Sequence, residues 1–160
     1  RRKPWTKAMA ALPAAVAAFA GPVWYLSRTM PAPTRSLALR VMTMPKDTNY
    51  YGTIFGGVIL SYIDQAGFVE ARRHGVHRWV TASIERVDFK APVHLGDTVN
   101  FYATTIREGT TSVSVRVDVE SERYTTGECV PVTSASLTMV AVDSKGKSIP
   151  FRTPPSVLND

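Results

Sequence analysis

Residues 49–64 read Asn-Tyr-Tyr-Gly-Thr-Ile-Phe-Gly-Gly-Val-Ile-Leu-Ser-Tyr-Ile-Asp, and this stretch indicates both the fold and the chemistry of the chain. An amide, Asn49, precedes a glycine turn, and a long apolar helix then begins at Gly56 and Gly57. The carboxylate of Asp64 lies two turns into that helix. A charge on an apolar helix is costly unless it is paired or functional, and the free N–H groups at a helix start can polarise a carbonyl. The stretch therefore predicts a hydrolase in which one helix carries both the acid and the free N–H groups that polarise a carbonyl.

The helix is expected over residues 56–73, and the rest of the chain alternates as strands do. The five predicted strands are residues 37–44, 79–89, 98–106, 112–120 and 132–142. The order β-α-β-β-β-β predicts an α+β fold in which a five-stranded antiparallel sheet wraps around one long central helix. Sheet edges that stay open predict a homo-oligomer.

The chain has 160 residues, a net charge of +6 and one cysteine. This length suits one domain, the positive charge favours an acidic or phosphorylated partner, and a lone cysteine excludes an internal disulfide. We expect an N-terminal extension over residues 1–33, a single domain over residues 34–152 and an irregular tail over residues 153–160. The extension is Ala-rich and basic, and it is disordered, a targeting segment or the product of a wrong start. Its apolar run is too short for a membrane span, so we expect a cytoplasmic protein unless the extension is a real targeting segment.

Familiar catalytic motifs are absent from the sequence: it has no Gly-x-Ser-x-Gly elbow, no phosphate-binding loop and no paired cysteines. His74 and His77 have a spacing that suits a metal, but no third ligand is evident, so we expect no metal. Asp64 is then either a buried acid paired with a nearby arginine, or a general base or nucleophile towards an acyl carbon. Asn49 is either a turn residue or a donor to a reacting oxygen. Small residues on the Asp64 side of the helix, such as Ser61, leave room for a ligand.

The same residues also carry a family resemblance. Residues 37–64 are similar to the signature of hot-dog fold acyl-CoA thioesterases of the bacterial YciA type, and they begin Leu-Ala-Leu-Arg-Val-Met-Thr-Met-Pro-Lys-Asp-Thr. The likeness continues through Arg-Val-Asp-Phe-Lys-Ala-Pro-Val at 86–93, Leu-Gly-Asp at 95–97, Gly-Thr-Thr-Ser at 109–112 and Met-Val-Ala-Val-Asp at 139–143. It covers roughly residues 37–152, and the predicted order of elements matches the hot-dog fold.

This resemblance implies hydrolysis of acyl-CoA thioesters. It implies that Asp64 is the catalytic acid, that Asn49 assists it across a dimer interface, and that the helix start at Gly57 polarises the thioester carbonyl. The substrate and CoA contacts it implies are Phe55, Gly56, Lys90, Arg107, Gly109, Thr110, Thr111 and Ser112. For Lys90 and Arg107 the alternative is a solvated charge at a strand end.

The expected partners follow from that activity. They are acyl-CoA and further copies of the chain, as a dimer or a trimer of dimers, with no nucleic acid and no membrane span. Coenzyme A is part of the substrate, so no cofactor is expected.

The chain departs from the family pattern at two tyrosines. Tyr50 and Tyr51 are bulky where such proteins often have smaller residues, and we expect them to narrow or cover the acyl site. The alternatives are a non-catalytic hot-dog protein that binds acyl-CoA or regulates another process, and a hot-dog hydratase or dehydratase. The presence of both Asp64 and Asn49 argues against the first, and the second needs a histidine near the helix start, where this sequence has none.

Overall fold

The computed structural model describes residues 35–154. Its elements are β1 (Ser36–Met42), η1 (Pro45–Asp47), α1 (Gly56–Ala71), η2 (Arg72–His74), β2 (Arg78–Ile84), β3 (Thr98–Glu108), β4 (Ser112–Glu122) and β5 (Cys129–Val142). The expected extension over residues 1–33 and most of the tail lie outside the described residues, so those boundaries and the cytoplasmic location remain predictions. Within the described part, no helix is long and apolar enough to cross a membrane.

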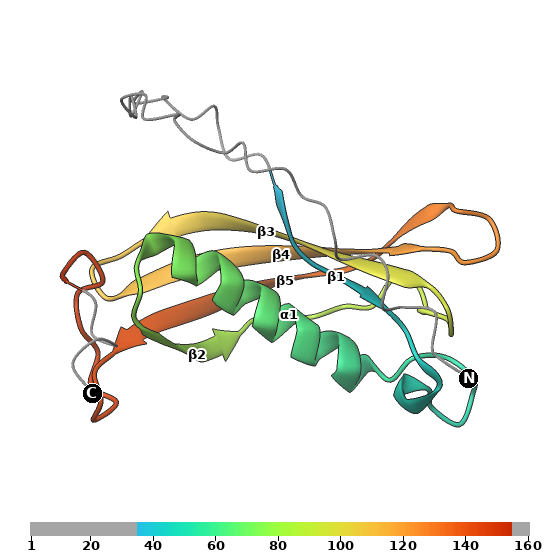
Figure 1. Ribbon diagram of the computed structural model, residues 1–160, viewed down its shortest axis with the longest axis horizontal. Coiled ribbons are helices and arrows are strands. Elements are labelled where there is room, and N and C mark those ends of the chain that lie inside the picture. The colour runs from blue at the N-terminus through green and yellow to red at the C-terminus, as the bar shows by residue number, and fades with distance from the viewer. Residues whose placement is uncertain (1–34, 155–160) are drawn as a thin grey trace, which may run out of the picture. The chain divides into compact units, whose positions relative to one another are not determined.

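The five strands form one antiparallel sheet in the order β1-β3-β4-β5-β2. The sheet curls so that α1 packs against all five strands, as Figure 1 shows. The predicted α+β arrangement of a sheet around one helix is therefore confirmed. Because β1 and β2 are the two edge strands, each has one row of backbone groups without a strand neighbour in the described protomer.

The core lies between α1 and the concave face of the sheet. The helix contributes Ile59 and Ile63, which are 2% and 0% exposed. The sheet contributes most through β4, whose alternating valines are at most 1% exposed: Val113, Val115, Val117 and Val119. A Cβ at Gly67 would come within 3.0 Å of a Leu137 methyl group, so a glycine lets the helix approach β5 closely.

Several predicted boundaries were wrong, for reasons visible in the backbone hydrogen bonds. The strand expected to run to residue 89 ends at Ile84, because the next residues meet β5 through scattered bonds such as Lys90 N to Val132 O at 2.8 Å. β5 begins at Cys129, three residues before the predicted start, and accommodates Pro131 beside an irregularity in its register with β4. β1 ends two residues early at Met42, while β3 and β4 continue two residues beyond the predicted ends.

One side of the helix stays open in this protomer. The expected stripe of small residues does not face the sheet, since Gly57, Ser61 and Phe68 are exposed and Asp64 is half-buried. The helix residues that do face the sheet are Ile59, Ile63, Ala66, Gly67, Glu70 and Ala71. Residues 35–154 therefore leave the Asp64 side of the helix partly uncovered.

Candidate active site

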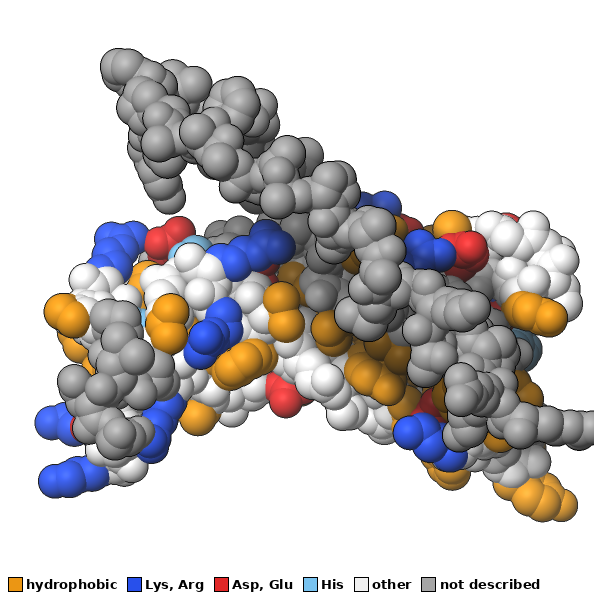
Figure 2. Space-filling view, in the orientation of Figure 1, with side chains coloured by type: hydrophobic (Ala, Val, Ile, Leu, Met, Phe, Trp, Pro, Cys, Tyr) orange, Lys and Arg blue, Asp and Glu red, His pale blue; other side chains and the backbone are white. Residues whose placement is uncertain are grey.

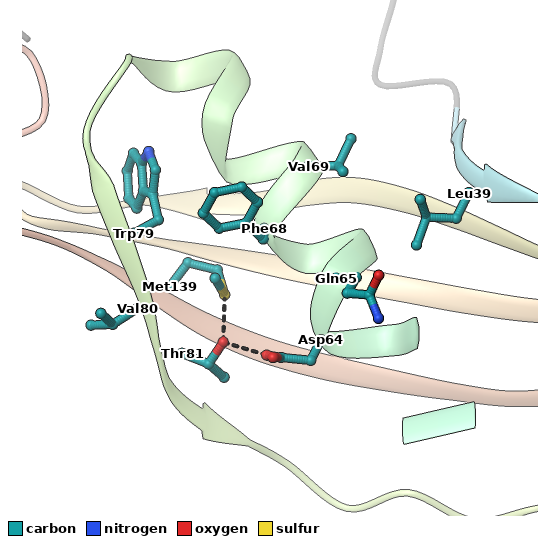
Figure 3. Close-up of a pocket in the computed structure, with 9 residues that line it drawn as sticks. All are labelled: Leu39, Asp64, Gln65, Phe68, Val69, Trp79, Val80, Thr81 and Met139. Atoms are coloured by element: carbon teal, nitrogen blue, oxygen red, sulfur yellow. Dashed lines mark hydrogen bonds between the residues drawn. The ribbon is translucent and has the colours of Figure 1, made fainter. Parts of the chain in front are cut away.

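Asp64 lies at the wall of a pocket between α1 and β2, with a volume of about 480 Å³. Figure 3 shows its carboxylate turned towards β2, where the hydroxyl of Thr81 donates a hydrogen bond to Asp64 Oδ1. The same hydroxyl oxygen lies 3.4 Å from the sulfur of Met139 on β5. Asp64 Oδ2 receives no hydrogen bond from residues 35–154, so one carboxylate oxygen is fixed and the other is available to a ligand.

The pocket itself is mainly apolar. Beside Asp64 and Thr81, its wall consists of Leu39, Gln65, Phe68, Val69, Trp79, Val80 and Met139. Phe68 and Val80 are 41% and 45% exposed, so two of the apolar side chains that line the pocket also reach the outside of the protomer. A carboxylate on the wall of an apolar, open pocket suits chemistry on a ligand that has an apolar chain.

The backbone of β2 explains how Thr81 reaches Asp64. The register with β5 pairs Thr81 with Met139 but Ser83 with Thr138, so the strand bulges directly after Thr81. Bulges re-aim side chains and are common beside active sites. Trp79 lies two residues before Thr81 and faces the same side of the strand. Its indole nitrogen donates a hydrogen bond to Gly75 O at 3.0 Å.

The start of α1 is a second reactive corner. No side chain caps the helix at Phe55, and the first amides bonded back to Phe55 O are those of Val58 and Ile59. The N–H groups of Gly56 and Gly57 thus lack acceptors among residues 35–154, and a Cβ at Gly57 would meet nothing within 4 Å. Free amides on an open helix start can polarise a carbonyl or hold an oxyanion.

A pocket of about 370 Å³ lies beside this helix start. Its wall is largely apolar, and Lys90 is its one charged residue. The rest of its wall consists of Ile54, Gly56, Ile59, Phe89, Ala91, Pro92 and Val93.

Asn49 holds the turn that precedes the helix. Its Oδ1 accepts the amides of Tyr51 at 2.9 Å and Thr53 at 3.2 Å, and its Nδ2 donates to the hydroxyl of Thr53 at 2.8 Å. The turn role considered from the sequence is therefore present. Gly56 and Asp64 are eight residues apart, or about 12 Å along the helix axis, so the helix start and the acid are separate corners of one protomer.

Comparison with known proteins identifies the family. The Thioesterase superfamily model matches residues 51–128. The acyl-CoA thioester hydrolase YciA of Escherichia coli K12 is 38% identical over 125 residues, which cover 76% of this chain and 95% of that protein. This chain belongs to the YciA-type acyl-CoA thioester hydrolases.

Solved structures agree with this family assignment and with the hot-dog fold. A hexameric hotdog fold thioesterase of Campylobacter jejuni is 44% identical, with a TM-score of 0.68, over 72% of this chain and 89% of that one. An acyl-CoA hydrolase from Staphylococcus aureus, solved with butyryl coenzyme A and coenzyme A, is 30% identical with a TM-score of 0.65. That match covers 73% of this chain and 72% of the Staphylococcus protein.

The family's expected CoA contacts do not gather at one place in the protomer. Lys90 lies at the helix start, where its amide bonds to Val132. The hairpin over residues 109–112 lies at the other end of the sheet, because Ser112 pairs with Val140. Eight residues of β5 separate these two positions, which is roughly 26 Å at the rise of a strand. One protomer therefore does not bring Lys90 and the hairpin to a common site.

Arg107 lies beside the hairpin, in a polar pocket of about 290 Å³ that Glu108 and Arg152 also line. Arg152 donates to Glu108 at 2.7 Å, and this bond lowers the pKa of the Glu108 carboxyl. Arg107 is exposed and forms no ion pair within residues 35–154, so its guanidinium is available to an anion. Arg107 is therefore a positive charge beside the hairpin that residues 35–154 leave unpaired.

Two of the three histidines have structural partners of their own. His74 Nε2 lies 2.8 Å from the hydroxyl of Thr105, and His77 Nε2 lies 2.7 Å from the carbonyl oxygen of Phe151. Within residues 35–154, no group of three metal-ligating side chains is present. None of the three histidines lines the Asp64 pocket, so a histidine-assisted hydratase has no support in this site.

Thr81 is the site residue that the sequence did not reveal. It lies 17 residues from Asp64 in a strand whose alternation gives no reason to single out one threonine. Its contact with Asp64 arises because β2 packs beside α1, and a single sequence does not show that packing.

Proposed function

We propose that this protein hydrolyses acyl-CoA to a free acid and CoA, with Asp64 acting on the acyl carbon. The observation that carries the proposal is a carboxylate, oriented by a threonine hydroxyl, on the wall of an open apolar pocket. The relatives named as acyl-CoA thioester hydrolases support the reaction class. The Staphylococcus relative solved with butyryl coenzyme A supports the class of substrate.

Two routes fit Asp64. As a general base, it takes a proton from water, the water oxygen attacks the carbonyl carbon, and the C–S bond of the tetrahedral intermediate then breaks to release the CoA thiolate. As a nucleophile, its oxygen attacks the same carbon, CoA leaves, and water hydrolyses the resulting anhydride. On either route the oxyanion takes a hydrogen bond from the Gly57 amide. A single turnover in heavy-oxygen water separates the routes, since only the nucleophilic one can place that oxygen in Asp64.

We infer that each site is shared between protomers. The free amide of Gly57 and the carboxylate of Asp64 are too far apart along one helix to meet at one thioester carbonyl. A second protomer that supplies Asn49 and Gly57 to the Asp64 of the first removes this difficulty. The enzyme is then a homo-oligomer, a dimer or a trimer of dimers, in keeping with the hexameric relatives.

The open surface beside Asp64 supports such an interface. The edge strand β2 exposes Val80 and Ile84, which are 45% and 39% exposed, and Phe68 of the helix lines the same pocket as Val80. Figure 2 shows hydrophobic side chains exposed along the face of the molecule that carries α1. Apolar side chains beside an unpaired strand edge are typical of surfaces that associate.

The charged part of CoA is proposed to bind where the chain offers free cations. Lys90 and Arg107, with the hairpin of Gly109, Thr110, Thr111 and Ser112, are the candidates, and Phe55 and Gly56 border the reactive end of the substrate. Because Lys90 and the hairpin lie at opposite ends of one sheet, one CoA molecule can contact both only if they come from different protomers.

Two assays test the proposal. Release of the CoA thiol from a panel of acyl-CoAs measures the reaction directly, and binding without release would support the non-catalytic alternative instead. Mixing inactive Asn49→Ala protein with inactive Asp64→Ala protein under subunit exchange should restore part of the activity, because some hybrid sites then combine both intact residues. No recovery despite proven exchange would place both residues in the site of one protomer.

A further inference from the structure

The turn over residues 49–52 presents two aromatic side chains to water. Tyr50 is 97% exposed and Tyr51 is 85% exposed, more than any other large apolar side chain in residues 35–154. Their rings meet edge to face, with centroids 5.7 Å apart and planes at 79°. Tyrosine combines a broad apolar face with a polar tip and is enriched in interfaces, so such a pair suits a surface that is covered in the assembled protein.

The turn holds this pair in fixed relation to Asn49. The Asn49 side chain accepts the amide of Tyr51 at 2.9 Å, and the amide of Gly52 bonds back to Asn49 O at 3.1 Å. Gly52 has a φ of +80°, the left-handed conformation that lets the chain reverse here. Since neighbouring Cα atoms are only about 3.8 Å apart, the two tyrosines stay close to Asn49 wherever it acts.

A surface that matches the pair lies at the Asp64 pocket. Phe68 and Val80, which line this pocket, are partly exposed, and no residue of the turn lines it in the same protomer. The protomer therefore has an uncovered aromatic pair at one place and an uncovered apolar opening at another. Bringing Asn49 of one protomer to Asp64 of a second brings these two apolar surfaces together.

We propose that Tyr50 and Tyr51 of one protomer form the outer wall of the acyl pocket of a second protomer, opposite Phe68 and Val80. This inference rests on the proposed function, because it needs the shared site. The two rings narrow the opening, so the enzyme selects slender, unbranched acyl chains and rejects wide ones. A single excess methylene in an apolar pocket typically changes kcat/KM by about 10- to 200-fold, so two rings are sufficient for strong selection.

The test compares a narrow acyl group with a wide one. Wild-type enzyme should favour butyryl-CoA over benzoyl-CoA, and Tyr50→Ala/Tyr51→Ala should lower this ratio of kcat/KM values by about 10-fold or more. Tyr50→Phe/Tyr51→Phe keeps the rings and should keep the ratio. Tyr124→Ala is a matched control, since Tyr124 is 79% exposed and lines neither the Asp64 pocket nor the helix-start pocket. An unchanged ratio in the double alanine variant, with hydrolysis intact, would overturn the wall and leave the proposed function standing.

Hybrid oligomers test which protomer supplies the wall. In a mixture of Asp64→Ala and Asn49→Ala chains, the active site takes Asp64 from the second chain and Asn49 from the first. Adding Tyr50→Ala/Tyr51→Ala to the Asp64→Ala chain should change the selectivity, and adding it to the Asn49→Ala chain should not. The reverse pattern would overturn the assignment to the partner, and a wild type without acyl-CoA hydrolysis would overturn both this inference and the proposed function.

Discussion

Replacing Thr81 by valine tests the orientation of Asp64 most selectively. The change removes the hydroxyl that donates to Asp64 Oδ1 and nearly preserves the shape of the side chain at the pocket wall. A hydrogen bond to a charged group contributes about 1.5–3 kcal/mol. At 1.36 kcal/mol for each factor of ten, losing it from the transition state should lower kcat by about 10- to 150-fold. KM should change little, because the hydroxyl contacts Asp64 and Met139.

The assay is steady-state CoA release with two control variants. Thr81→Ser keeps a hydroxyl and should recover most of the activity. Thr138→Val makes the same chemical change on β5 outside the pocket lining and should leave kcat unchanged. If Thr81→Val keeps the wild-type kcat, or if Thr138→Val loses as much, the hydroxyl does not orient the catalytic carboxylate.

Three further predictions address the rest of the account. Gly57→Pro removes one free amide while the first helical turn tolerates proline, so kcat should fall about 10²- to 10³-fold with helix content retained; a normal kcat would mean that the carbonyl is polarised elsewhere. Rising ionic strength should increase KM for acyl-CoA more than it lowers kcat, because salt screens exposed charges. Lys90→Ala or Arg107→Ala should raise KM for acyl-CoA but not for a pantetheine thioester. Equal effects on both substrates would exclude a nucleotide site at Lys90 and Arg107. Burial acts to raise the pKa of the Asp97 carboxyl, but hydrogen bonds from the His94 amide, Ser121, Arg123 and the Tyr124 amide hold that pKa below its usual value. The ionised carboxylate therefore stabilises the fold above pH about 4, and this stabilisation is lost as the pH falls through the lowered pKa. Asp97→Asn should cost about 3–5 kcal/mol at neutral pH and flatten the acid limb of urea-unfolding free energies, whereas an acid limb as steep as the wild type's would assign the pH dependence to other groups.

Local sequence patterns were enough to predict the order of elements. The four valines of β4 alternate with polar residues, which indicates a strand. The apolar run after Gly56 is too long for a strand, which indicates a helix. Strand ends were less predictable because distant residues decide them. β2 stops at Ile84 and β5 begins at Cys129 according to hydrogen bonds between segments far apart in the chain.

In the candidate site, too, local patterns were predictable and contacts between distant residues were not. Asp64 was conspicuous because a carboxylate on an apolar helix needs a reason, and Gly56 and Gly57 because they begin that helix. Thr81 could not be found, since its contact with Asp64 depends on how β2 packs against α1. Lys90 and the hairpin at Gly109 looked like one binding group in the sequence, but they lie at opposite ends of a sheet. Which of these residues share a site is then decided by how protomers assemble, and a single sequence does not contain that arrangement.

The catalytic role of Asp64 is tested by the kcat of Asp64→Asn with butyryl-CoA. The substitution keeps the size of the side chain and removes the carboxylate that acts as base or nucleophile. We expect a loss of about 10²- to 10⁴-fold in kcat, with circular dichroism and melting temperature close to those of the wild type. Near-native turnover by the folded variant would mean that Asp64 does not carry out the hydrolysis.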